Sequence, residues 1–269
     1  MGTPVQQEPK EDYKSESSIA NVYNASEYKE SNLKIDGARG NTVEFWLKKD
    51  GYDVTKTGKE VLFDATVLGT ALTDPDYGRL TIELDHNVSK YNTPLHMTYR
   101  SGSAGTTLSS IGSSAITPSS ISDGKWHHYA FTFKYTTKLE ITMYLDGIYN
   151  DKKLIVSAAI GPVDGNIVGA IGSLVAPTTG APAAAIGYGK LTGSMDEFRF
   201  WKSARSAKDI GDHWLSQVGG GTNKHTSNAD LGVYYKFNEG ITGTSSIDSV
   251  ALDYSGRISN GSWVGYSAQ

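Results

Sequence analysis

The sequence contains no cysteine among its 269 residues. Disulfide bonds, thiolate metal sites and cysteine nucleophiles are therefore excluded. No apolar run approaches the roughly 20 residues that a membrane-spanning helix requires, so we expect no membrane insertion. Clusters of basic residues are also missing, and the formal net charge is −4. Because phosphate binding needs grouped Lys and Arg side chains, we expect no nucleic-acid partner.

The first 30 residues are polar and mix acidic with basic side chains. We interpret residues 1–30 as a polar N-terminal arm or linker, and residues 31–269 as a single domain, because no repeat and no second change of composition follows. The arm lacks the apolar core of a signal peptide. We expect an extracellular or virion-surface location, reached either through a leader outside this chain or by assembly with other components.

Apolar and polar residues alternate with a period of two in many short runs, which is typical of half-buried strands. In the first run Val43, Phe45 and Leu47 alternate with Glu44 and Trp46. Asp-Gly pairs, which favour tight turns, lie next to several of these runs. The pattern predicts an all-β fold, a two-sheet antiparallel jelly-roll β-sandwich. The expected strands are 42–48, 60–67, 79–85, 95–100, 126–133, 139–145, 195–201 and 231–237.

Three stretches depart from this alternation. Residues 101–122 are dominated by Ser, Gly and Thr and predict a surface loop or an irregular sheet edge. Residues 157–187 are rich in Ala and Gly, and we interpret them as a long lid or contact loop. One short helix is expected after the 195–201 strand, because Ser206 and Asp209 fit a capping box. Its expected apolar face consists of Ile210, Trp214, Leu215 and Val218.

Four segments occur in an order that is informative when they are taken together. They are TVEFWLK (42–48), DGKWHHYAFTF with LEITMYLDG (123–147), GSMDEFRFWKSARSAKDI (193–210) and LGVYYKFNEG with LDYSGR (231–257). This combination resembles the laminin-G-like domains of the concanavalin A-like lectin/glucanase superfamily. The resemblance implies a jelly roll that is usually non-catalytic and serves glycan or protein adhesion. Such modules occur in bacterial extracellular proteins, as appendages of enzymes and in phage virions.

Glucanases of this superfamily carry the pattern E-x-D-x-E on one strand, so the resemblance raises the question of catalysis. Glu83 and Asp85 fill the first two positions, but Asn87 stands in the third, where the general acid is required. Retaining hydrolysis needs two carboxyl groups about 5–5.5 Å apart and a proton donor. Nucleophile-elbow and phosphate-loop motifs are also missing. We therefore predict no catalytic residues, with a glycoside hydrolase as the less favoured alternative.

Two charged features suggest a structural role. His127 and His128 resemble a metal-binding pair, but neighbouring positions on a strand point to opposite faces, so they cannot bind one ion together. Glu197 and Arg199 alternate on one strand and share a face. We expect them to pair with each other or with a charge such as Glu44 on a neighbouring strand.

Calcium is the one cofactor that the sequence suggests. Asp74 and Asp76 flank a proline in a turn, and Asp196 lies in the 195–201 strand. Carboxylate oxygens suit Ca²⁺, so these three residues are candidate ligands. In the alternative interpretation the first two form a plain acidic turn, and Asp196 anchors a turn of the backbone.

Aromatic residues divide into packing groups and candidate sugar platforms. Trp46, Trp126 and Trp201 fall within expected strands, and we interpret them as packing groups. A sugar site needs exposed rings on loops. The candidates are Tyr52, Tyr77, Tyr91 and Tyr188.

The sequence predicts a non-catalytic carbohydrate-binding or adhesion module on a surface such as that of a phage virion, with a glycan or a protein surface as its partner. In the alternative, the protein is a structural virion or assembly component. Its N-terminal arm and the 157–187 loop would then contact neighbouring subunits, including copies of itself in a homo-oligomer.

Overall fold

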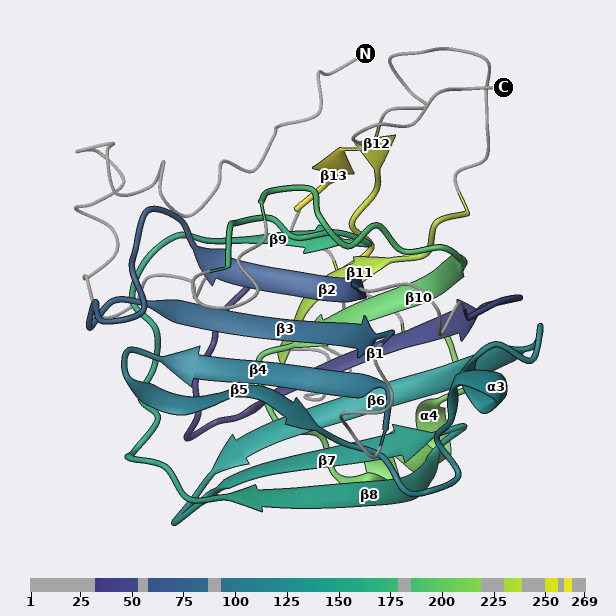
Figure 1. The fold of residues 1–269 in the computed structure, drawn as a ribbon, viewed down its shortest axis with the longest axis horizontal. Helices are drawn as coiled ribbons and strands as arrows, with labels where there is room; N and C mark the ends of the chain where they lie inside the picture. Colours follow the sequence, from purple (N-terminus) through teal and green to yellow (C-terminus); the bar gives the residue numbers. More distant parts are fainter. Residues whose placement is uncertain are drawn as a thin grey trace, which may run out of the picture.

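The computed structural model describes residues 32–52, 58–86, 93–178, 185–218, 230–238, 250–255 and 259–262. They form two antiparallel sheets that face each other, as Figure 1 shows. The larger sheet has six strands in the order β11-β10-β1-β6-β7-β8. Its strands are β1 (Asn41–Lys48), β6 (Trp126–Tyr135), β7 (Leu139–Leu145), β8 (Ile148–Ile155), β10 (Ser194–Trp201) and β11 (Leu231–Tyr235).

The second sheet has five strands in the order β5-β4-β3-β2-β9, and a separate short pair joins β12 to β13. The five strands are β2 (Lys59–Val67), β3 (Gly78–Asp85), β4 (Leu95–Ser101), β5 (Ala104–Ser110) and β9 (Ile167–Ile171). The short pair consists of β12 (Val250–Ala251) and β13 (Gly261–Ser262). The predicted all-β sandwich is confirmed.

The core lies between the sheets and follows from the alternation of side chains along each strand. Val43 and Phe45 of β1 point inward and are fully buried, as are Leu80, Ile82 and Leu84 of β3. Polar residues between them point to the outer faces. No helix among the described residues is long and apolar enough to cross a lipid bilayer.

Three strands of the two main sheets arise where the sequence predicted none or was ambiguous. β5 lies within 101–122 and is the edge strand of the five-stranded sheet, so the prediction of an irregular edge was closer than that of a loop. β9 lies within 157–187 and pairs with β2, so the prediction of one long loop was wrong. β8 pairs with β7 at the opposite edge. In all three, backbone pairing with a neighbour stabilises a strand that local alternation does not reveal.

Two short helices occur among the described residues, where the sequence predicted one. The expected helix is α4 (Ala207–His213), and its capping box of Ser206 and Asp209 is confirmed. The additional helix is α3 (Pro118–Ile121), which also begins with a capping box. Ile210 of α4 is fully buried against the six-stranded sheet, but the helix ends before Leu215, which is 71% exposed. The prediction that Leu215 shares the buried face was therefore wrong.

Candidate functional site

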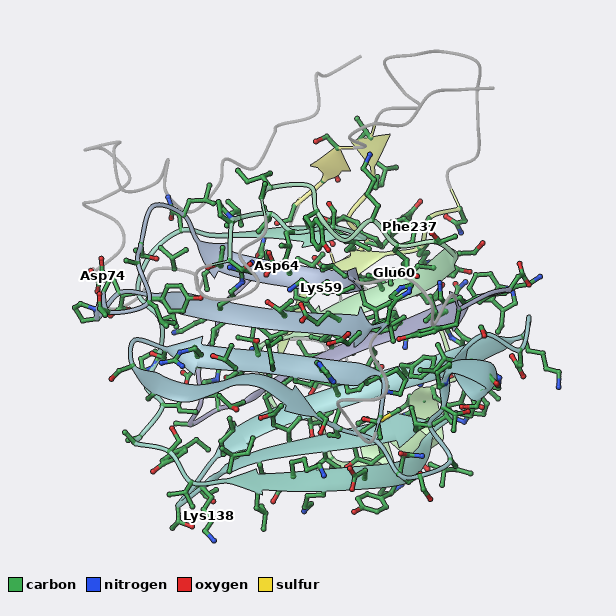
Figure 2. All side chains as sticks on the ribbon, in the orientation of Figure 1. Lys59, Glu60, Asp64, Asp74, Lys138 and Phe237 are labelled. Atoms are coloured by element: carbon green, nitrogen blue, oxygen red, sulfur yellow. The ribbon has the colours of Figure 1, made fainter. Side chains whose placement is uncertain are left out.

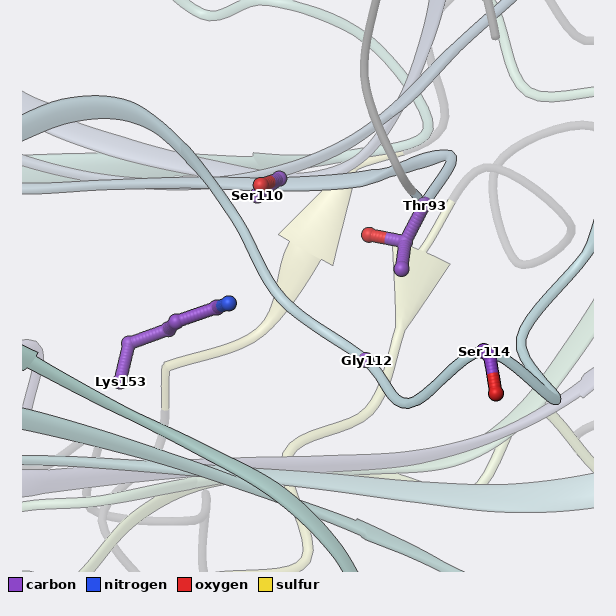
Figure 3. A pocket seen from close by; sticks show the side chains of 5 residues that line it. All are labelled: Thr93, Ser110, Gly112, Ser114 and Lys153. Atoms are coloured by element: carbon purple, nitrogen blue, oxygen red, sulfur yellow. The ribbon is translucent and has the colours of Figure 1, made fainter.

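A cavity of about 380 Å³ is lined by residues from three separate parts of the chain. Figure 3 shows the side chains that line it. Thr93 precedes β4, Ser110 ends β5, and Lys153 belongs to β8. The two remaining lining residues are Gly112 and Ser114. Since β5 and β8 are the edge strands of the two sheets, the cavity lies beside the open edge of the sandwich.

The loop 111–116 forms one wall of this cavity, and hydrogen bonds to β8 hold it in place. The Gly112 N–H donates to Asp151 Oδ2 at 3.0 Å, and the next N–H along the chain, that of Ser113, donates to Asn150 Oδ1 at 2.9 Å. Ile111 and Ile116 are buried in the core on either side. These contacts bind the loop to the edge strand of the opposite sheet and give the cavity a fixed wall.

Lys153 is the one charged residue among the described residues that line the cavity. Its Cα partner in β7 is Ile141, a buried core residue, so Lys153 lies on the inward side of the edge strand. The Nζ atom lies 3.8 Å from Asp151 Oδ2, and the side chain is 45% exposed. Lys152, next to it, points to the other face and binds Glu140 Oε1 at 2.9 Å. The edge strand therefore presents one ammonium group toward the cavity.

The lining groups favour binding of a ligand rich in hydroxyl groups. The hydroxyl of Thr93 donates to the Ile111 carbonyl oxygen at 2.7 Å, which leaves its oxygen able to accept. The hydroxyls of Ser110 and Ser114 have no hydrogen-bond partner among the residues that the structure describes. Each can donate one hydrogen bond and accept others. None of the described lining residues carries a carboxyl or imidazole group that general acid–base catalysis would use.

The four candidate tyrosines occupy different environments. Tyr52 is half-buried: its hydroxyl donates to the Asp85 carbonyl oxygen at 2.5 Å, and its ring stacks on His86 with centroids 4.8 Å apart. Tyr77 is only 9% exposed, so the expectation that it offers an open ring was wrong. Tyr188 is 43% exposed, so its ring is accessible to a ligand. Tyr91 lies outside the described residues.

Asp74 and Asp76 form a local turn. The Asp76 N–H donates to Asp74 Oδ1 at 2.9 Å, and the Tyr77 N–H donates to the Asp74 carbonyl oxygen at 3.0 Å. These contacts match the alternative of a plain acidic turn. In the described part of the chain, no three His, Cys, Asp or Glu side chains are grouped as metal ligands. Calcium binding at this turn therefore stays a prediction.

Asp196, the third candidate calcium ligand, lies at the other end of the sandwich from Asp74. Asp196 is the Cα partner of Trp46 in β1. Lys49 follows Trp46 by three residues, and its Nζ atom lies 2.8 Å from Glu60 Oε1. Asp196 therefore lies at the same end of the sandwich as Glu60. Figure 2 shows Asp74 and Glu60 far apart along the sandwich. The structure therefore does not bring the three candidate ligands into one site.

The acidic pair that resembles a glucanase motif is engaged in ion pairs. Glu83 is almost fully buried, and its Oε2 lies 2.7 Å from Lys59 Nζ. Burial raises the pKa of Glu83, against the opposing effect of Lys59. Asp85 Oδ2 lies 3.7 Å from His96 Nδ1. Asn87 lies outside the described residues. Glu83 is thus neutralised by a lysine, an arrangement that suits a structural role.

The two adjacent histidines point to different partners, as predicted. His127 lies between two carboxylates: its Nδ1 is 2.8 Å from Asp146 Oδ2 and its Nε2 is 3.3 Å from Asp123 Oδ2. Burial lowers the pKa of His127, but these two carboxylates outweigh it and the pKa is raised. His128 points to the outer face, where its Nε2 lies 3.7 Å from Glu44 Oε2.

The predicted pairing of Arg199 is confirmed. Its Nη2 lies 2.7 Å from Glu197 Oε2, and its Nη1 lies 3.6 Å from Glu44 Oε2.

The tryptophans that we interpreted as packing groups differ in how deeply they are buried. Trp201 is buried as expected, but Trp126, which we interpreted as a packing group, is 42% exposed at the start of β6. Its Cα partner in β1 is Lys48, and it shares the outer face of β6 with His128, opposite the core residues Tyr129 and Phe131.

Sequence reasoning missed the cavity residues altogether. Ser, Thr and Gly at 93 and 110–114 carry no local signal of a site, and Lys153 lies in a strand that was not predicted. Only the approach of the two sheet edges brings these positions together.

Comparisons with known proteins cover most of the chain. A family model described as the concanavalin A-like lectin/glucanases superfamily matches residues 23–211. No curated protein sequence matches. A solved structure from Bacteroides ovatus, of a protein to which carbohydrate binding has been ascribed, has a TM-score of 0.48 at 18% identity and covers 83% of this chain and 51% of its own. The SAP-like pentraxin of Limulus polyphemus has a TM-score of 0.40 at 12% identity, with 66% of this chain and 71% of its own covered. The chain thus spans about half the length of the first of these structures.

Proposed function

The chain belongs to the concanavalin A-like lectin/glucanase superfamily, and from that premise we propose that it is a non-catalytic carbohydrate-binding module whose ligand enters the cavity between β5 and β8. The observation that carries the proposal is the chemistry of the lining: three hydroxyl groups and one ammonium group, with no carboxyl group among the described lining residues. Sugars present many hydroxyl groups that donate and accept, and such groups match serine and threonine.

The size of the cavity supports a small ligand. Ligand sites of proteins have volumes of roughly 300–1,000 Å³, and the cavity lies near the lower end of that range at about 380 Å³. It therefore suits one or two sugar rings. The non-catalytic part of the proposal is supported by the pairing of Glu83 with Lys59, since retaining hydrolysis needs two carboxyl groups free to act on one bond.

A glycan array with two matched variants tests the proposal. Ser114→Trp places a large ring at an exposed lining position, and Ser119→Trp places the same ring at an exposed position of α3 outside the lining. We expect the unmodified protein and Ser119→Trp to bind the same glycans, and Ser114→Trp to lose at least tenfold in affinity. Equal binding by both variants would place the ligand elsewhere. Failure of the unmodified protein to bind any glycan would refute the function.

Two finer proposals remain. The first is display on a cell or virion surface, and the alternative is assembly through contacts that the arm 1–30 and the segment 157–187 make with neighbouring subunits. Size-exclusion chromatography with light scattering tests the second. A stable oligomer that is lost when residues 1–30 are removed would favour the assembly role.

A further inference from the structure

We propose that the cavity between β5 and β8 selects sugars that carry a negative charge, and that Lys153 is the residue that recognises this charge. The inference rests on the proposed function, because it names the class of ligand for the same cavity. It depends on where Lys153 points, on what its ammonium group contacts, and on the other groups that line the cavity.

The ammonium group of Lys153 has unused hydrogen-bond donors. Its nearest anionic partner, Asp151 Oδ2, lies 3.8 Å from Nζ, which is longer than a hydrogen bond. Neighbouring Lys152 forms a direct contact of 2.9 Å with Glu140. An ammonium group has three N–H donors and no acceptor. Lys153 therefore keeps its donors for another acceptor, and its side chain, 45% exposed, is accessible to a ligand.

Asp151 leaves the N–H donors of Lys153 unused, because its carboxylate hydrogen-bonds to the loop instead. Oδ2 accepts the Gly112 N–H at 3.0 Å, which turns the carboxylate toward the wall of the cavity. The carboxylate thus fixes the loop, while the ammonium group points along the lining.

The groups around Lys153 suit the rest of a sugar. Ser110 and Ser114 have hydroxyls without partners among the described residues, and the oxygen of Thr93 still accepts. None of these groups is anionic, and the nearby carboxylate of Asp151 is hydrogen-bonded to the Gly112 N–H in the loop wall. The arrangement combines one cationic donor with several neutral hydroxyls. The chemical class that matches is a sugar with one carboxylate or one sulfate group.

Titrations of ¹⁵N-labelled protein, followed by NMR, test this inference with three monosaccharides. Galactose is neutral, galacturonic acid carries a carboxylate, and galactose 6-sulfate carries a sulfate. A charged hydrogen bond at a half-exposed group corresponds to a preference of about five- to tenfold. We expect at least one anionic sugar to bind with this preference over galactose, and the stronger of the two identifies the anion. Raising NaCl from about 50 to 500 mM should weaken only the anionic binding.

Lys153→Met removes the charge and keeps most of the side-chain volume. We expect this variant to lose the preference for the anionic sugar and to bind galactose within about twofold of the unmodified protein. Lys125→Met is the matched control, because Lys125 also lies 3.8 Å from an aspartate but does not line the cavity. An unchanged melting temperature for both variants would show that the fold is intact.

The outcomes separate the inference from the proposed function. Equal affinity for galactose and both anionic sugars, or a preference that persists in Lys153→Met, would overturn the role of Lys153 and leave glycan binding standing. Absence of binding to all three sugars, together with a blank glycan array, would overturn the proposed function itself. A preference lost in Lys125→Met as well would also count against Lys153, since it would indicate a general effect of net charge.

Discussion

Glu44 offers the sharpest test of how charges stabilise the outer face of the six-stranded sheet. Its side chain is 1% exposed, and its Oε1 lies 2.6 Å from Arg205 Nη1. The other carboxylate oxygen faces Arg199 and His128 at 3.6 and 3.7 Å. Burial raises the pKa of Glu44, but His128, Arg205 and Arg199 together outweigh it and lower the pKa from 4.5 to about 2.

The size of this effect follows from the two pKa values. A difference of one pKa unit corresponds to about 1.4 kcal/mol, so a pKa of about 2 in place of 4.5 stabilises the folded state by about 3 kcal/mol at pH 7. Since the folded pKa is the lower one, the contribution is fully present above pH 4.5 and is lost as the pH falls through 2. By the same relation, about 1.4 kcal/mol of this stabilisation of the folded state remains at pH 3.

Urea unfolding of Glu44→Gln at pH 7 and pH 3 measures this contribution. Glutamine keeps the shape and removes the charge, and the loss of one partner of a buried ion pair costs about 3–5 kcal/mol in other proteins. We expect the variant to be less stable than the unmodified protein by about 3 kcal/mol at pH 7 and by less than half of that at pH 3. Glu140→Gln is the control: the pair of Glu140 with Lys152 is exposed, so its loss should cost at most about 1 kcal/mol. A deficit that is the same at both pH values would refute the reasoning.

Further predictions concern a histidine, a turn and the cavity. The raised pKa of His127 means that its ion pairs stabilise the fold below its ordinary pKa of 6.5, and that this contribution is lost as the pH rises through the raised value. His127→Gln should therefore lower the melting temperature more at pH 5.5 than at pH 8.5, and an equal loss at both would contradict this. Gly147 has φ of +75°, and an added Cβ would lie 2.4 Å from Trp214 Cδ1. Gly147→Ala should cost at least about 1–2 kcal/mol and shift the tryptophan fluorescence, whereas an unperturbed spectrum would show that Trp214 is not held there. At the cavity, Ser114→Trp should weaken glycan binding at least tenfold, and Lys153→Met should abolish only the preference for anionic sugars.

Much of the fold could be predicted because local alternation reports which face of a strand is buried. The expected strand 139–145 coincides with β7, and the expected strand 195–201 differs from β10 by one residue. The capping box at Ser206 was also readable, since its hydrogen bonds join residues three apart in the chain. The family resemblance arises from these same segments, and it is confirmed by the match over residues 23–211.

The edge strands depend on tertiary structure. β5 is rich in Gly, Ser and Thr, and β8 has polar and charged residues at its centre. These two sequences gain little from burial, so their strands exist because a neighbouring strand supplies hydrogen-bond partners. β9 is a five-residue strand, IVGAI, too short for alternation to distinguish it from the Ala- and Gly-rich segment around it.

The sequence by itself determined that this chain forms a two-sheet β-sandwich of a known superfamily, because alternation and capping act over a few residues. Only the tertiary structure decided where the proposed ligand site lies. The cavity unites Thr93, Ser110 and Lys153, which lie up to 60 positions apart. Their side chains meet because the edges of two sheets approach each other, and that approach is set by packing of the whole core.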